Sequence, residues 1–291
     1  MVKDNSLSGR VFGAIVHIVM IAVVLVTLLP VIHVIAISFS DKYAIARGEV
    51  GLWPVNFSWA SYIAIFKSGN VPRSFMNAVY YTALGTVINM VMTTMMAYPL
   101  SRTYLTFRKF YNILVLITMF FSGGLIPTFL VVKNLGMYDT VWAIVLPGAI
   151  STWNMIIMRT FFMALPAELE ESAQLDGAND FTIFTKIVLP LSKASLATIG
   201  LFYAVGHWNS WFSAMIYFKS SKSYPLQTIL RSIVINTEIS DEIQVDEVVD
   251  SISSEGIKYS TLVVSMVPMM AIYPFIQKYF GKGVMIGSLK G

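Results

Sequence analysis

Six long apolar stretches dominate the sequence and restrict the chain to a helical, membrane-spanning fold. They cover about 12–37, 74–98, 110–131, 140–163, 190–215 and 259–279. Each is long enough for a helix to cross the hydrocarbon core of a bilayer, which takes about 20 apolar residues. Only 12% of the 291 residues are charged, about half the usual share of roughly 25% in soluble domains. We therefore expect an all-α membrane protein with six transmembrane helices in a single domain over residues 1–291.

The basic residues indicate the orientation of the predicted spans. An even number of spans places both termini on the same side of the membrane. That side then carries eleven basic and six acidic residues, and the other side carries nine basic and ten acidic residues. Because cytoplasmic loops are enriched in Lys and Arg, this favours cytoplasmic termini. The loop 164–189 would then lie in the cytoplasm and the loop 216–258 outside the cell. The basic residues form no long patch, which argues against nucleic-acid binding.

Several chemistries lack the residues that they need. The predicted spans contain no Asp or Glu, although ion- and proton-coupled carriers usually have an ionisable group there. There is no cysteine, no phosphate-binding G-x-x-x-x-G-K-[ST] loop and no catalytic motif. We therefore expect no enzyme activity, no catalytic residue and no metal site. Active transport would need energy from another chain, and a self-contained secondary carrier or channel is the alternative.

The segment 164–189 is unusually acidic for this chain. It holds five carboxylates within 13 residues: Glu168, Glu170, Glu171, Asp176 and Asp180. Pro166 and the glutamates suit the first turn of a helix, and Gly177 suits a left-handed stop. Asn179 or Asp180 would cap a second helix, with an apolar stripe of Phe181, Phe184 and Val188. The first helix has about ten residues, too few for stability alone in water, so we expect it to have a partner.

The order of residues in this segment resembles the signature of bacterial ABC importer permeases, E-A-A-x3-G-x9-I-x-L-P. Glu171-Ser172-Ala173 is followed after three residues by Gly177 and after nine more by Ile187-x-Leu189-Pro190, and Ser172 stands where alanine is usual. The stretches "LPAELEESAQLDGA" and "QKYFGKGVMIGSLKG" look like MalG-like carbohydrate-uptake permeases. "FFSGGLIPTFLVVKNLGMYDT" and "GHWNSWFSAMIYF" look like the LplC/YtcP-type branch. The resemblance implies a type I importer permease (MetI-like) fold in a bacterial cytoplasmic membrane.

The resemblance also implies that the acidic helix is a coupling helix, which docks on an ATP-binding subunit. The candidate coupling residues are Glu170, Glu171, Ser172, Ala173, Leu175, Asp176, Gly177 and Ala178. Glu171 would pair with a basic residue of the ATPase, Ala173 would pack against the ATPase, and Gly177 would make the turn. The tail from about 278 to 291 would reach towards the ATPase dimer interface.

The partners implied by the resemblance are a second, MalF-like permease subunit, two ATP-binding subunits, an extracellular substrate-binding lipoprotein and the lipid bilayer. This chain would bind no cofactor, because ATP and magnesium belong to the ATPase subunits. The cargo would be a carbohydrate, and we expect an oligosaccharide.

Aromatic and amide side chains near the end of the fifth stretch are candidates for the substrate pathway. Sugars stack on aromatic faces and pair their hydroxyls with amides, and Trp208, Asn209 and Trp211 offer both chemistries. An aromatic belt at the membrane interface is the alternative. The acidic cluster "TEISDEIQVDEVVD" in the loop 216–258 would meet the binding protein when it docks, or else be a solvated loop.

Overall fold

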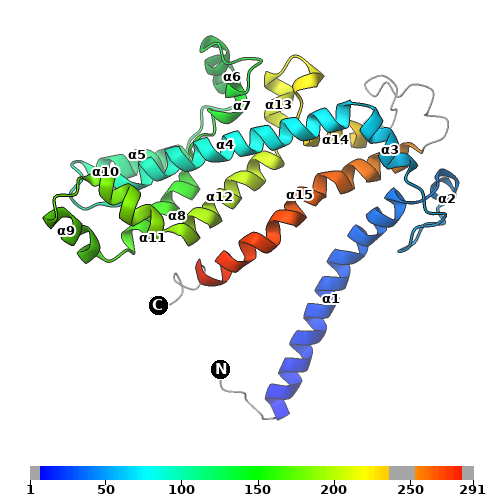
Figure 1. The fold of residues 1–291 in the computed structure, drawn as a ribbon, viewed down its shortest axis with the longest axis horizontal. Helices are drawn as coiled ribbons and strands as arrows, with labels where there is room; N and C mark the ends of the chain where they lie inside the picture. The colour runs from blue at the N-terminus through cyan, green and yellow to red at the C-terminus, as the bar shows by residue number, and fades with distance from the viewer. Residues whose placement is uncertain (1–6, 236–252, 284–291) are drawn as a thin grey trace. The chain divides into compact units, whose positions relative to one another are not determined.

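The regular structure of the described residues is entirely helical, in a computed structural model that describes residues 7–235 and 253–283. Three helices carry segments long and apolar enough to cross a membrane without a break: α1 (Leu7–Ser38), α4 (Asn70–Ser101) and α15 (Ser254–Gly283) (Figure 1). The shorter helices are α2 (Lys42–Ala46), α3 (Ala60–Lys67), α5 (Arg108–Phe120), α6 (Leu125–Asn134), α7 (Trp142–Val145), α8 (Thr152–Met163), α9 (Ala167–Leu175), α10 (Asp180–Ile183), α11 (Leu189–Leu191), α12 (Lys193–Trp208), α13 (Phe212–Tyr217) and α14 (Leu226–Ile235).

The structure interrupts three of the six apolar stretches. α5 and α6 meet at 113°, and the run from α10 to α11 meets α12 at 83°, so the described residues hold up to five crossing segments if each bent pair is one span. The stretch 140–163 contains the short α7 and α8 on either side of Pro147 and Gly148. Proline lacks the amide hydrogen that a continuing helix needs. The all-helical membrane fold is confirmed, and the count of six crossings stays a prediction.

The bend between α5 and α6 has a local cause in the sequence. Gly123 and Gly124 lie between the two helices, and Gly124 takes a φ of +83°. Residues with a Cβ rarely adopt this conformation, whereas glycine does so freely. Hydropathy over 110–131 gives no sign of the bend, because the residues on both sides of the glycines are apolar.

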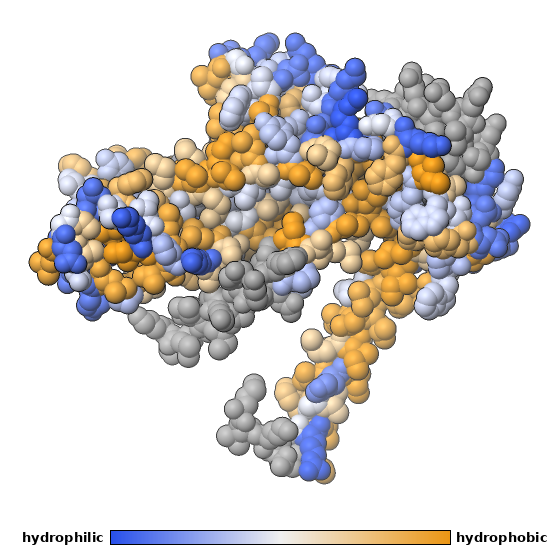
Figure 2. Space-filling model, viewed as in Figure 1, coloured by the Kyte–Doolittle hydropathy of each residue, from blue (hydrophilic) through white to orange (hydrophobic). Residues whose placement is uncertain are grey.

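The described residues form two compact units, each with its own core. The described residues of the first unit are 7–72, 232–235 and 253–266. Its core packs Ala36 and Ile37 at the end of α1 against Ala44 and Ile45 of α2. The apolar side chains along most of α1 are exposed (Figure 2). Such a surface is stable in hydrocarbon, which suits a helix surrounded by lipid.

The described residues of the second unit are 73–231 and 267–283, and they include the acidic segment. α8 lies at the centre of this unit and contacts α5 and α12. Met155, Met158 and Phe162 repeat along one face of α8 and are fully buried. Ala97 and Tyr98 of α4 and Ile199 and Tyr203 of α12 complete this core, together with Ile183, Phe184 and Val188 from the segment after α9. The acidic segment is therefore packed directly against the membrane helices.

Two predictions lie outside the described residues. The acidic cluster falls within residues 236–252, and the end of the tail falls within residues 284–291.

Candidate functional site

The acidic helix forms where the sequence predicts it. α9 spans Ala167–Leu175, with Pro166 immediately before it and Glu168 and Glu170 in its first turn. Negative charges in that turn are stabilised by the helix dipole. The helix ends at Gly177, whose φ is +81°.

A paired hydrogen-bond motif closes the C-terminus of α9. The amide of Ala178 donates to the carbonyl of Ala173 at 2.9 Å, and the amide of Gly177 donates to the carbonyl of Gln174 at 3.0 Å. These two bonds define the Schellman stop, in which glycine supplies the left-handed residue. The predicted left-handed stop at Gly177 is confirmed.

The chain restarts at once as a second short helix. Asn179 is the residue that caps it, because its side chain accepts a bond from the amide of Thr182 at 2.8 Å. α10 continues through a π-helical turn (Phe184–Val188) into α11, which contains Pro190. Of the predicted apolar stripe, Phe184 and Val188 are buried, whereas Phe181 is exposed. The buried pair fixes the acidic segment to the core of the second unit.

Glu170 faces inward and forms an ion pair within the same chain. Its carboxylate meets the guanidinium of Arg102 just beyond the end of α4, and both side chains are nearly buried. Arg102 also donates to the carbonyl of Phe162 at 3.1 Å and lies 4.8 Å from the centre of the Tyr98 ring. Burial raises the pKa of Glu170, and the charge of Arg102 opposes that shift. This pair, which we call the anchor, joins α9 to the ends of α4 and α8.

The opposite face of α9 has no partner among the described residues. Glu168, Glu171, Ser172 and Leu175 follow the spacing of one helical face, and all four are exposed or partly exposed. Leu175 is 89% exposed. We call these four residues the outer face. Asp176 and Gly177 at its end are also exposed, while Ala173 and Ala178 pack against the core.

The predicted coupling residues thus divide into two groups. Glu171, Ser172, Leu175, Asp176 and Gly177 are accessible, while Glu170, Ala173 and Ala178 hold the segment in place. Sequence reasoning missed Arg102 as the partner of Glu170. The helical spacing of Glu170 and Ala173 gives a weak signal, because it places the carboxylate on the face that also carries the small apolar residue.

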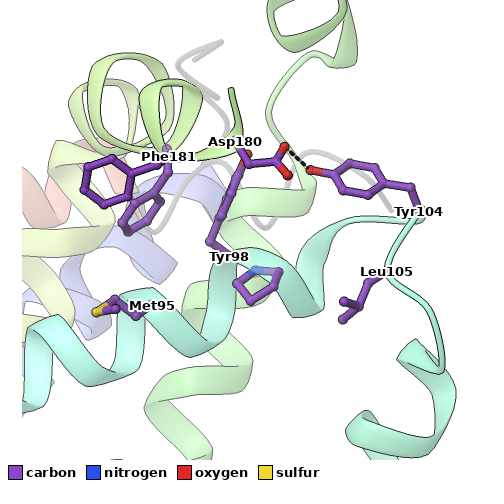
Figure 3. A pocket seen from close by; sticks show the side chains of 8 residues that line it. Met95, Tyr98, Tyr104, Leu105, Asp180 and Phe181 are labelled. Atoms are coloured by element: carbon purple, nitrogen blue, oxygen red, sulfur yellow. Dashed lines mark hydrogen bonds between the residues drawn. The ribbon is translucent and has the colours of Figure 1, made fainter. Parts of the chain in front are cut away.

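Two cavities of about 290 Å³ each flank the acidic segment. The first is apolar and is lined by residues that include Met95, Tyr98, Leu105, Phe181 and Phe184 (Figure 3). At one side of it, the hydroxyl of Tyr104 donates to Asp180 at 2.9 Å. Burial is the largest cause that raises the pKa of Tyr104, so the phenol stays protonated as a donor. The second cavity is more polar and contains Arg102, Glu170 and Glu171.

The three predicted pathway residues lie in different surroundings. Trp208 is 2% exposed and packs edge-on against Phe75, with 5.8 Å between the ring centres. Asn209 is exposed at the end of α12. Trp211 is half-buried, and the guanidinium of Arg231 lies 3.6 Å from the centre of its ring. The indole of Trp208 therefore has no free face for a sugar, whereas Asn209 and Trp211 are accessible.

A polar network at the α4–α12 contact was not predicted. Asn89 donates to the carbonyls of Gly148 and Ala149 at 2.8 and 3.0 Å, and its side-chain oxygen lies 2.7 Å from Nε2 of His207. These carbonyls belong to the break between α7 and α8, where a continuous helix would have supplied backbone amides as hydrogen-bond donors. Asn89 therefore compensates the interrupted stretch with side-chain hydrogen bonds.

Comparison with known proteins connects this arrangement to a large group of transport proteins. Residues 59–286 match the family described as "Binding-protein-dependent transport system inner membrane component". The chain is 43% identical over 289 residues to the polygalacturonan/rhamnogalacturonan transport system permease protein YtcP of Bacillus subtilis, covering 98% of this chain and 100% of the relative. It is 41% identical over 288 residues to protein LplC of the same organism, covering 99% and 97%.

A solved structure shares both the fold and part of the sequence. It is a crystal structure of a bacterial ABC transporter involved in the import of the acidic polysaccharide alginate. One of its chains superposes with a TM-score of 0.89 at 32% identity, covering 94% of this chain and 98% of that one.

Proposed function

The chain belongs to the family of binding-protein-dependent transport system inner membrane components, and from this premise we propose that α9 couples it to an ATP-binding subunit during uptake of an acidic oligosaccharide. Family membership makes it a multi-pass permease subunit of an ABC importer in the cytoplasmic membrane. Such a subunit is not catalytic and binds no cofactor itself, and ATP is hydrolysed on a separate subunit. A self-contained carrier or channel is therefore no longer needed as an alternative.

The two-faced construction of α9 is the observation that carries the coupling proposal. The anchor and the buried side chains after Gly177 hold the helix against the membrane core. The outer face leaves Glu171 and Leu175 accessible to another chain. Such a helix transmits a push or pull from that chain, because its inner contacts join it to the ends of α4 and α8. ATP-driven closure of the ATPase pair would act on the outer face and move the membrane helices.

The chemistry of the outer face fits a basic partner surface. Two exposed carboxylates, Glu168 and Glu171, lie beside one large apolar side chain, Leu175. An arginine or lysine of the ATPase would pair with Glu171, and an apolar depression beside it would take Leu175. Truncating one member of a buried charge pair at an interface costs about 2–5 kcal/mol, enough to uncouple transport.

The substrate part of the proposal rests on the relatives. One relative is named for transport of polygalacturonan and rhamnogalacturonan, and the solved structure concerns an importer of alginate, which its title calls acidic. We therefore assign an oligosaccharide that contains uronate rings as the cargo of this permease. The complete importer would contain a second permease subunit, two ATP-binding subunits and a substrate-binding lipoprotein, with both termini of this chain in the cytoplasm.

A charge reversal on the outer face tests the coupling proposal. In the assembled transporter, Glu171→Lys places a cation opposite the basic partner. We expect it to abolish co-purification of the ATPase or to leave ATP hydrolysis running without uptake. Glu255→Lys is the matched control, since Glu255 is also an exposed glutamate in the first turn of a helix.

The two variants should differ in transport and not in membrane insertion. ATP-driven uptake by Glu171→Lys at the rate of the control would overturn the coupling assignment.

A further inference from the structure

We propose that Arg231 and Trp211 form a subsite for a sugar ring that bears a carboxylate, beyond the C-terminal end of α12. This inference rests on the proposed function, because it assigns the residues that recognise the acidic cargo. It adds a specificity-determining residue, Arg231, that no motif in the sequence indicates.

The pair places a cation against an aromatic ring. The guanidinium of Arg231 lies 3.6 Å from the centre of the Trp211 ring, which places it in stacking contact. The indole is half-buried and Arg231 is exposed. Asn209, two residues before Trp211, is exposed as well and offers an amide for hydroxyl groups.

Stacking leaves the hydrogen-bonding edge of the guanidinium available. A cation–π contact occupies one face of the planar group, whereas its N–H donors point outward in the plane. Those donors match the two oxygens of a carboxylate and bind it through two parallel hydrogen bonds. A uronate ring beside the pair can therefore direct its carboxylate to Arg231, while the indole, covered on one face by the guanidinium, holds the cation in position.

Arg231 has no acidic partner within the described part of the chain. Among the residues whose side chains the structure describes, 7–235 and 253–274, no carboxylate lies in ion-pair range of Arg231 and no hydrogen bond to its side chain occurs. In the same residues, Arg47 pairs with Glu49 and Arg102 pairs with Glu170. No carboxylate of the described side chains therefore neutralises the charge of Arg231.

Hydrogen bonds hold the backbone around the pair in place. Thr228, three residues before Arg231 on α14, donates its hydroxyl to the carbonyl of Trp211 at 3.2 Å. Asn77 and Tyr81 of α4 donate to carbonyls of the segment 222–224, which leads into α14, at 2.8 to 3.2 Å. Arg231 is thus carried by a fixed helical turn. A group held in its binding position before the ligand arrives loses less entropy on binding.

The subsite is separate from the outer face of α9. α12 has 16 residues between the acidic segment and Asn209, so its two ends are about 24 Å apart at 1.5 Å per residue. Changes at Arg231 should therefore alter the handling of substrate without touching the ATPase contact.

Transport of matched acidic and neutral sugars tests the proposal. The complete importer, reconstituted in vesicles with its binding protein, takes up tetragalacturonate or its methyl ester, which has the same rings without the charges. Comparing each variant with the wild type for each sugar cancels the preference of the binding protein. Arg231→Gln should reduce uptake of tetragalacturonate about tenfold at subsaturating concentration, because it removes one charge-assisted contact between the transporter and the carboxylate. Uptake of the ester should stay at the wild-type rate.

Two further variants sharpen the result. Arg231→Lys keeps the positive charge but loses the two parallel N–H donors of the guanidinium. It should therefore take up tetragalacturonate faster than Arg231→Gln but more slowly than the wild type. Lys219→Gln is the control, since Lys219 is an exposed cation 5.5 Å from the centre of the Tyr138 ring and lies outside the subsite. It should leave both sugars unaffected.

The inference is overturned if Arg231→Gln lowers uptake of both sugars equally, which indicates a purely structural pair, or if it changes neither. If the wild-type importer takes up tetragalacturonate but Arg231→Gln has no effect, only this inference fails. If the wild type takes up neither sugar, the substrate assignment under the proposed function fails with it.

Discussion

Two adjacent glutamates on α9 illustrate how position on a helix divides structural from functional roles. Glu170 lies against Arg102 with both side chains nearly buried, while Glu171 points away from the core and is exposed. A helix turns by about 100° per residue, so neighbours in sequence face different surroundings. Both carboxylates are candidate coupling residues from the sequence, but of the two only Glu171 is exposed and can meet another chain.

The anchor gives a prediction at the scale of single residues. Glu170→Ala leaves Arg102 buried without its counter-charge, which should destabilise the packing of α9 by about 3–5 kcal/mol. Amide hydrogen exchange over Ala167–Leu175 would measure the loss in the isolated permease. Glu171→Ala, at the next residue, should change the free energy of opening measured by exchange by no more than about 0.5 kcal/mol, because the side chain of Glu171 is exposed. Equal effects of the two substitutions would contradict the anchor.

At the scale of elements, the contact between α4 and α12 depends on a glycine. A Cβ at Gly85 would lie 2.5 to 2.8 Å from three ring atoms of His207, closer than atoms can pack. His207 would have to leave Asn89, which supports the break between α7 and α8. We expect Gly85→Ala to destabilise the protein by about 1–3 kcal/mol through overpacking.

A second glycine provides the control for this prediction. A Cβ at Gly200, inside α12, meets only Met90 at an ordinary 3.7 Å. Gly200→Ala should be neutral or stabilising by up to about 1 kcal/mol, because glycine is a poor helix former. Thermal unfolding of the purified protein in detergent would compare the two. A midpoint for Gly85→Ala at or above that of Gly200→Ala would refute the role of the close contact.

Local signals account for the elements that the sequence predicts correctly. The stop at Gly177 and the cap at Asn179 depend on residues within one turn of each helix end, so they can be recognised without tertiary information. The breaks at Gly123–Gly124 and Pro147–Gly148 also have a local signal, because glycine and proline interrupt helices. The apolar residues on both sides of each break nevertheless favour an unbroken span in the sequence prediction. The anchor and the Arg231–Trp211 pair join residues far apart in sequence, and nothing local encodes which partners meet.

At the scale of the whole molecule, the proposed ATPase contact and the proposed sugar subsite lie towards opposite ends of α12. The anchor and the buried side chains after α9 join the outer face of α9 to the core of the second unit. The Arg231–Trp211 pair lies beyond the other end of α12. On these two proposals, the ATP-binding subunit and the substrate act on separate surfaces of the same helical unit.

The central claim, that the outer face of α9 binds the ATP-binding subunit, can be tested by site-specific cross-linking. The chain has no cysteine, so Leu175→Cys introduces a single thiol in this chain at a position that is 89% exposed in the isolated chain. A maleimide carrying a photoreactive group is attached there before the complex is assembled. Leu135→Cys, at the end of α6 and also exposed, is the control.

We expect illumination of the assembled importer to join the ATP-binding subunit to the labelled Leu175→Cys variant and not to the labelled Leu135→Cys variant. A Leu175→Cys thiol that reacts freely with a water-soluble maleimide in the assembled importer, and that yields no cross-link to the ATPase, would contradict this claim.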